Sequence, residues 1–118
     1  MKPFEVTFPG NKKVDVTFGQ FEIKTDQSKE NEGEETAPEP FDIFLSSLAA
    51  CAGIYAKSFC DTREIDTTGM KIVQEVFRKE NQKLIDEIQL TLYVNENFPE
   101  KYHAAILKSI NGCTVKKQ

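Results

Sequence analysis

Three cysteines carry the most reactive side chains in the sequence, and their spacing decides which of them could act together. Cys51 and Cys60 share the apolar run "SSLAACAGIYAKSFC", and Cys113 stands near the C-terminal end. If residues 41–60 form one helix, Cys51 and Cys60 lie roughly 13–14 Å apart and on opposite sides. A disulfide needs Cα atoms within about 7 Å. Cys113 is therefore the only intrachain partner open to Cys51.

Simple packing is the competing interpretation for each thiol, because a free cysteine is among the most buried residue types. Composition alone favours this interpretation for Cys51 and Cys113, and it is strongest for Cys60. A metal site has little support, since the sequence has no C-x-x-C pair and only one histidine. That histidine, His103, lies among lysines on a predicted helix, where exposure is expected. No metal ligand set is predicted.

The remaining composition narrows the possible partners. The sequence has no glycine-rich phosphate loop and no nucleophile elbow, so no cofactor is expected. A formal net charge of -4 argues against binding to nucleic acid or to anionic membranes. The N-terminal "MKPFEVTFPG" lacks a secretory signal, and the apolar run 43–56 is too short to cross a bilayer. We expect a cytoplasmic protein with reduced thiols.

The N-terminal 24 residues alternate apolar and polar side chains, which is typical of half-buried strands. The turn signal "PGNKK" separates two such stretches, and Gly19 shifts the phase of the alternation. We predict two strands, a bulge or tight turn at Gly19, and then a third strand or a continuation of the second. Residues 25–40 hold no large apolar side chain and several glutamates, which predicts a long surface loop. We interpret the charge of this loop as a sign that it is solvated; the alternative is that the loop is a functional lid.

A long helix should follow this loop, because Pro40 and Asp42 suit its first turn. Residues 41–60 are apolar nearly all round, which is typical of a buried helix. Two strands are predicted over residues 70–94, with a helix over 70–87 as the competing prediction. Residues 97–112 predict a second helix, followed by "CTVKKQ" as a short strand or tail. The order predicts a single α+β domain, residues 1–118, with antiparallel sheets and a long buried central helix.

The segment "APEPFDIFLSSLAACAG" resembles the start of the central helix in the OsmC/Ohr family, the osmotically induced and organic hydroperoxide resistance proteins. In that family a proline precedes an apolar helix that bears the reactive cysteine about three turns in. A second cysteine follows the last helix in a C-x-V context. Here these elements are Pro40, Cys51 and "CTV", which contains Cys113 and Val115. The resemblance covers nearly the whole chain.

The resemblance implies an intertwined homodimer with active sites at its interface, and a role in the oxidative stress response. It also implies a thiol peroxidase cycle, in which the Cys51 thiolate reduces an organic hydroperoxide and becomes a sulfenic acid. Cys113 would then form a disulfide with Cys51, and an external dithiol such as a lipoyl group would reduce it. An apolar wall from Phe44, Leu48, Ile54 and Tyr55 would suit a greasy peroxide.

The sequence departs from the family at the groups that activate the thiol. Family peroxidases use an N-terminal arginine held by a glutamate just after the proline. This chain has only Arg63 and Arg78, both after the helix, and Phe41 follows Pro40. Because burial raises a thiol's pKa, another cation must lower it, and Lys12, Lys13, Lys24 and Arg63 are the candidates.

Two other functions stay open because that activating pair is missing. A non-catalytic protein could hold a small apolar ligand, with Cys51 merely lining its pocket. A redox-responsive protein could form the disulfide between Cys51 and Cys113 slowly and without turnover.

Overall fold

The structure is a computed structural model that describes residues 2–78 and 85–111. It divides into two compact units, residues 1–45 and 46–118, and each is considered by itself. The predicted final strand or tail "CTVKKQ", and Cys113 with it, lies outside the described residues. The prediction of a single domain stays a prediction.

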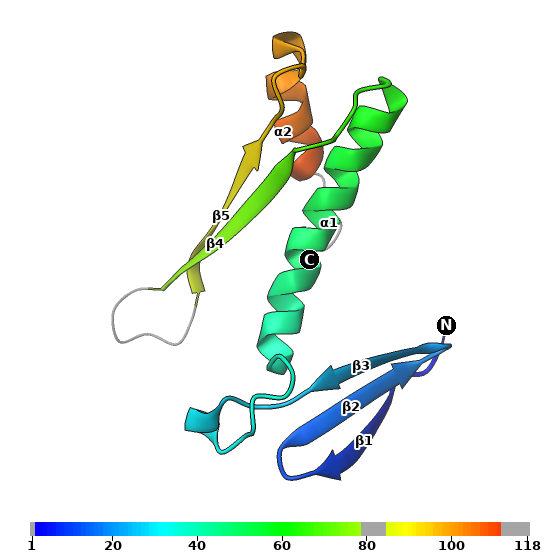
Figure 1. The fold of residues 1–118 in the computed structure, drawn as a ribbon, viewed down its shortest axis with the longest axis vertical. Helices are drawn as coiled ribbons and strands as arrows, with labels where there is room; N and C mark the ends of the chain where they lie inside the picture. Colours follow the sequence, from blue (N-terminus) through cyan, green and yellow to red (C-terminus); the bar gives the residue numbers. More distant parts are fainter. Residues whose placement is uncertain (1, 79–84, 112–118) are drawn as a thin grey trace. The chain divides into compact units, whose positions relative to one another are not determined.

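The first unit holds a three-stranded antiparallel sheet in the order β1-β2-β3, formed by Glu5–Gly10, Lys13–Phe18 and Phe21–Thr25 (Figure 1). Gly19 has a φ of +56° and lies in the tight turn between β2 and β3, where Phe18 pairs with Phe21. Its left-handed conformation suits glycine, which has no Cβ to clash. The phase shift in the sequence therefore marks a turn and a third strand.

The acidic loop after β3 is organised around a buried carboxylate, that of Asp26. Its Oδ2 accepts hydrogen bonds from the Thr36 hydroxyl at 2.6 Å and from the Thr36 backbone N–H at 3.1 Å. Its Oδ1 accepts one from the Gln27 N–H at 2.7 Å. These bonds, the Thr36 hydroxyl first, lower the pKa of Asp26 to about 2. The loop also contains a short 3-10 helix, η1 (Lys29–Asn31).

A 23-residue helix, α1 (Pro40–Thr62), begins in the first unit and continues into the second. The second unit then adds the strands β4 (Lys71–Arg78) and β5 (Ile85–Tyr93), paired antiparallel. The competing prediction of a helix over 70–87 is wrong. The short 3-10 helix η2 (Glu100–Tyr102) leads into α2 (His103–Asn111). The predicted α+β fold with antiparallel sheets and a long helix is thus confirmed.

The core of the second unit lies between α1 and α2. Ile106 and Ile110 of α2 are 1% and 3% exposed and belong to one buried cluster with part of α1. The other members of the cluster are Ala52, Ala56, Phe59, Cys60 and Phe98. Side chains of β4 and β5 pack against this cluster from the sheet, among them Ile72, Leu90 and Leu92.

Within the single chain, α1 buries one stripe and not its whole circumference. Leu48, Ala52 and Ala56 are buried, whereas Phe44 and Ile54 are 51% and 57% exposed. The prediction that this helix is buried all round is therefore wrong for the single chain: apolar residues occupy all faces of α1, but only one face is buried.

The prediction that the apolar segment is too short to cross a bilayer rested on the run 43–56. In the described part of the chain, α1 is long and apolar enough to span a membrane by length and composition. The length argument is therefore wrong. The core helix of a soluble protein passes the same test, and α1 does pack on α2 through its buried stripe.

Candidate functional site

Cys51 lies in the middle of α1 and is half-buried. Helix geometry places Leu48, Ile54 and Tyr55 within about 60° of it around the axis. Leu48 is buried and Tyr55 is half-buried, but Ile54 is exposed. Phe44, the fourth member of the predicted apolar wall, belongs to the first unit. The surroundings of Cys51 within its own unit are thus apolar on one flank and open on the other.

Cys60 occupies the core of the second unit as a free thiol with no exposed surface. Burial and the neighbouring Asp61 carboxylate raise the pKa of this thiol, against a smaller opposing effect of Lys57 and Arg63. A thiol that is neutral and out of contact with solvent reacts slowly with oxidants. The prediction that Cys60 serves packing is confirmed.

The structure answers part of the question of which cation activates Cys51. Arg63 lies just beyond the end of α1, twelve residues from Cys51 in sequence and so about 18 Å along the helix. Its guanidinium carbon lies 3.6 Å from the centre of the Phe59 ring, and its Nη1 donates to the Phe59 carbonyl at 3.1 Å. Arg63 of the same chain is therefore not the activating cation.

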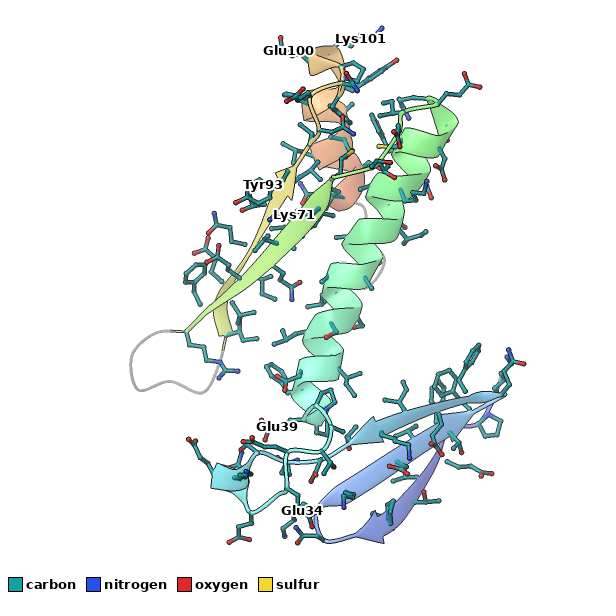
Figure 2. The ribbon with its side chains drawn as sticks, viewed as in Figure 1. Glu34, Glu39, Lys71, Tyr93, Glu100 and Lys101 are labelled. Atoms are coloured by element: carbon teal, nitrogen blue, oxygen red, sulfur yellow. The ribbon has the colours of Figure 1, made fainter. Side chains whose placement is uncertain are left out.

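The other cation candidates, three lysines, belong to the first unit, where two of them form ion pairs. Lys13 contacts Glu34 at 3.2 Å, and Lys24 contacts Glu22 at 3.5 Å. Figure 2 shows the side chains of the loop that contains Glu34. Lys12 is exposed. That one of these lysines, or a cation of a second subunit, activates Cys51 stays a prediction.

His103 is exposed, as the sequence predicts, and its ring lies 5.5 Å from that of Phe98. Among residues 2–78 and 85–111, no group of three or more histidine, cysteine, aspartate or glutamate side chains could hold a metal ion. Neither Cys51 nor Cys60 is therefore part of a metal-ligand cluster in that part of the chain.

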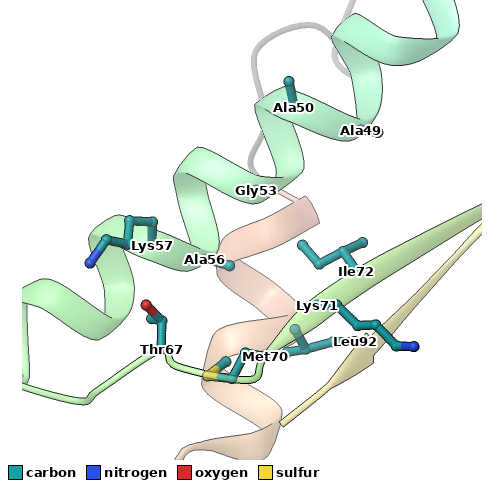
Figure 3. A pocket seen from close by; sticks show the side chains of 10 residues that line it. All are labelled: Ala49, Ala50, Gly53, Ala56, Lys57, Thr67, Met70, Lys71, Ile72 and Leu92. Carbon is teal, nitrogen blue, oxygen red and sulfur yellow. The ribbon is translucent and has the colours of Figure 1, made fainter.

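A cavity of about 420 Å³ lies between α1 and the start of β4 (Figure 3). Its helix wall consists of small residues such as Ala49 and Gly53 together with one lysine, Lys57, and its sheet wall includes Ile72 and Leu92. Helix geometry turns Ala49 and Gly53 about 160° away from Cys51 around the axis. Cys51 does not line this cavity, so the cavity lends no support to a ligand that Cys51 would contact.

Two features of the structure were not predicted from the sequence: the hydrogen bonds of the Asp26 carboxylate in the first unit and the stacking of Arg63 in the second. The sequence did contain a signal for the Arg63 contact, because Phe59 and Arg63 are four residues apart at a helix end, where such side chains are neighbours. Asp26 had none, since its partner Thr36 is ten residues away in an irregular loop.

Comparison with known proteins decides the family. The family model described as "OsmC-like protein" matches residues 31–118, which include α1, both strands of the second unit and α2. The chain belongs to the OsmC-like family. The comparison of this OsmC-like protein with curated proteins found no match.

Solved structures agree with the family in fold. A Psychrobacter arcticus 273-4 protein, linked by its name to osmotic stress and detoxification, is 24% identical with a TM-score of 0.83, covering 99% of this chain and 87% of that one. An OsmC-like protein from Mycoplasma pneumoniae is 17% identical with a TM-score of 0.77, covering 99% and 85%. The organic hydroperoxide resistance protein OhrB of Bacillus subtilis is 18% identical with a TM-score of 0.55, covering 98% and 88%.

Proposed function

We propose that this OsmC-like protein is a thiol peroxidase for organic hydroperoxides, with Cys51 as the attacking thiol and Cys113 as the resolving thiol. The Cys51 thiolate attacks the outer peroxide oxygen and becomes the sulfenic acid, while the O–O bond breaks and the alkoxide leaves and takes up a proton to become the alcohol. The thiolate of Cys113 then attacks the Cys51 sulfenic acid, forms the disulfide and expels hydroxide, which leaves as water once protonated. A dithiol of the lipoyl type reduces the disulfide and restores both thiols.

The observation that carries this proposal is the packing of α2 on α1, because it supports the pairing of these two thiols. Tyr102, just before α2, stacks edge-on against Phe59 near the end of α1 with ring centres 5.7 Å apart. From there α2 runs back along α1 towards its middle, as Figure 1 shows. Ile110, eight residues after Tyr102, belongs to the same buried cluster as Ala52, the neighbour of Cys51. Cys113 is three residues further on, and three extended residues span up to about 10 Å.

We also propose that the protein is a soluble, cytoplasmic homodimer. A second copy would cover the apolar side chains that α1 exposes, which are Phe41, Phe44 and Ile54. An active site completed by that copy would then enclose Cys51 and the substrate. Neither nucleic acid nor membrane is part of the proposal.

A non-catalytic ligand-binding protein is the second candidate, and the cavity between α1 and β4 is the observation that favours it. Its volume of about 420 Å³ and its mainly apolar walls, which also include Lys57 and Lys71, are typical of a small-molecule site. Native mass spectrometry of the freshly purified protein tests this candidate. A copurified small molecule that Gly53→Leu displaces would support it.

The peroxidase is tested by the consumption of cumene hydroperoxide, with dihydrolipoamide as reductant, for the wild type, Cys51→Ser and Cys60→Ser. We expect turnover in the wild type and in Cys60→Ser, because Cys60 is buried and inert, and background rates in Cys51→Ser. Equal background rates in all three proteins would contradict the proposal.

A further inference from the structure

The helix wall of the cavity contains a glycine, Gly53, at a point where neither conformation nor packing requires one. Gly53 lies inside α1 with no positive φ, and a Cβ added there would meet no neighbouring atom of the described residues within 4 Å. Glycine inside a helix lowers its stability relative to alanine, because the unfolded chain gains conformational freedom. Ala49 extends the same wall by one turn. The chain therefore leaves open a space beside α1 that a side chain could fill.

The wall opposite α1 is apolar. Ile72 of β4 and Leu92 of β5 are paired across the two strands, and both pack against the buried cluster. Met70, just before β4, packs against the same cluster and also lines the cavity (Figure 3). Aliphatic and thioether groups stabilise a bound hydrocarbon because they remove its apolar surface from water. This part of the cavity therefore suits a hydrocarbon chain or ring.

One end of the cavity is polar. Lys57 of α1 and Thr67 of the loop after α1 both line it, and Figure 3 shows the Thr67 hydroxyl turned towards the helix. The Lys57 Nζ donates to the Asp61 carboxylate at 2.6 Å. Because an ammonium group has three donors, Lys57 keeps further N–H groups beside this ion pair. An oxygen atom of a ligand could accept a hydrogen bond from Lys57 and form another with the Thr67 hydroxyl.

The charges at the polar end decide which kind of oxygen fits there. The hydrogen bond and the charge of Asp61, with a smaller contribution from Asp66, raise the pKa of Lys57. Two carboxylates thus act on one ammonium group, and no positive charge is in surplus. An anionic head group would compete with Asp61 for Lys57, and a cationic one would be repelled by Lys57. A neutral hydroxyl or carbonyl group meets neither obstacle.

Lys71, the second lysine of the cavity, does not change this balance. It directly precedes Ile72 on β4, so its side chain leaves the strand on the face turned away from α1. There its Nζ lies 5.1 Å from the ring centre of Tyr93, the residue with which it pairs on β5. Figure 2 shows these two side chains on the sheet, and Figure 3 shows Lys71 running away from the helix. The ammonium group of Lys71 is therefore directed out of the cavity.

We propose that this cavity binds a small neutral amphiphile, an aliphatic or aromatic alcohol or ketone, with its oxygen at Lys57 and Thr67 and its hydrocarbon part between the apolar walls. The volume of about 420 Å³ is in the range of small-molecule sites. The inference names the ligand class of the ligand-binding candidate above and rests on that candidate. It does not depend on the reaction of Cys51, which lies about 160° from Gly53 around the axis of α1.

The test compares three probes that share an eight-carbon chain and differ in the head group, namely 1-octanol, octanoate and octylammonium. Isothermal titration calorimetry measures their binding to the full-length protein below the concentrations at which the probes aggregate. We expect 1-octanol to bind, and the two charged probes to bind about threefold more weakly or worse, which is the size of a typical surface charge interaction. A charged probe that binds as tightly as 1-octanol would overturn the inference.

Two substitutions locate the bound probe. Gly53→Leu places a side chain in the open space and should abolish the binding of 1-octanol, while circular dichroism should show an intact fold, because leucine favours a helix more than glycine does. Thr67→Val removes one hydroxyl and should weaken binding about 2- to 10-fold, the usual contribution of one hydrogen bond. Thr91→Val is the matched control, because Thr91 alternates with Leu92 and lies on the other face of β5.

We expect Thr91→Val to bind 1-octanol like the wild type. Unchanged binding in Gly53→Leu would place the probe elsewhere and would overturn the inference. So would a wild type that does not bind 1-octanol and that Gly53→Leu converts from dimer to monomer in analytical ultracentrifugation, because a second copy would then occupy the cavity.

The inference and the ligand-binding candidate fail in different ways. If no probe binds the wild type and native mass spectrometry finds no copurified molecule, the candidate fails and the inference falls with it. If a charged molecule copurifies and Gly53→Leu displaces it, the candidate is supported and only the inference of a neutral ligand is overturned.

Discussion

Ile106→Ala should strongly destabilise the second unit, because Ile106 is the α2 side chain most deeply placed between the two helices. It is 1% exposed and belongs to the same cluster as Ala52, Ala56 and Phe59. Truncation removes its γ and δ carbons and leaves a cavity that the packed neighbours of Ile106 can fill only in part. Such a change costs about 2–5 kcal/mol, and Ile106→Val, which removes one carbon, about 0.5–1.5 kcal/mol.

The assay is urea unfolding followed by far-ultraviolet circular dichroism, with all variants at one protein concentration because a dimer makes stability concentration-dependent. Leu107→Ala is the matched control on the next position of α2, where the side chain is 49% exposed. We expect its cost to stay below about 1 kcal/mol. An Ile106→Ala cost no larger than that of Leu107→Ala would refute the packing of α2 on α1, and with it the argument that brings Cys113 to Cys51.

Three further predictions concern the loop and the thiols. The pKa of Asp26 is about 2 against its usual 3.8, so its ionised carboxylate stabilises the fold above pH 4 and this contribution is lost as the pH falls towards 2. The difference in urea midpoint between the wild type and Asp26→Asn should therefore shrink over that range. A constant difference would contradict this expectation. Gly33→Ala should lower the thermal midpoint, because its Cβ would lie 2.0 Å from the Gln27 carbonyl oxygen; an unchanged melting curve would show that the loop packs differently. Cys60 should resist iodoacetamide at pH 7 until the protein unfolds, since burial raises the pKa of its thiol and keeps the reagent away; rapid labelling of the folded protein would contradict its burial.

The fold was largely predictable because most of its elements carry strong local patterns. The alternation from Phe4 to Ile23 indicated the first sheet, and Pro40 marked the first turn of α1. The burial of α1 was not predictable, because an apolar circumference cannot show which side the same chain covers. That depends on α2 and β4, which lie far along the sequence.

The candidate site was predictable only in part. Helix spacing separated Cys51 from Cys60, and the structure places Cys60 in the core. Within one chain Arg63 is ruled out as the activating cation, which charge and position in the sequence could not show, because they do not reveal what a side chain stacks on. Its contacts with the rings of Phe59 and Tyr102 are visible only in the structure.

The central claim is that Cys51 is the peroxide-reactive thiol, and mass spectrometry after a single equivalent of cumene hydroperoxide tests it most directly. The account predicts a trapped sulfenic acid on Cys51 in Cys113→Ser and a disulfide between Cys51 and Cys113 in the wild type, with Cys60 reduced in both. Reduced Cys51 in both proteins, or oxidation at Cys60 first, would contradict it.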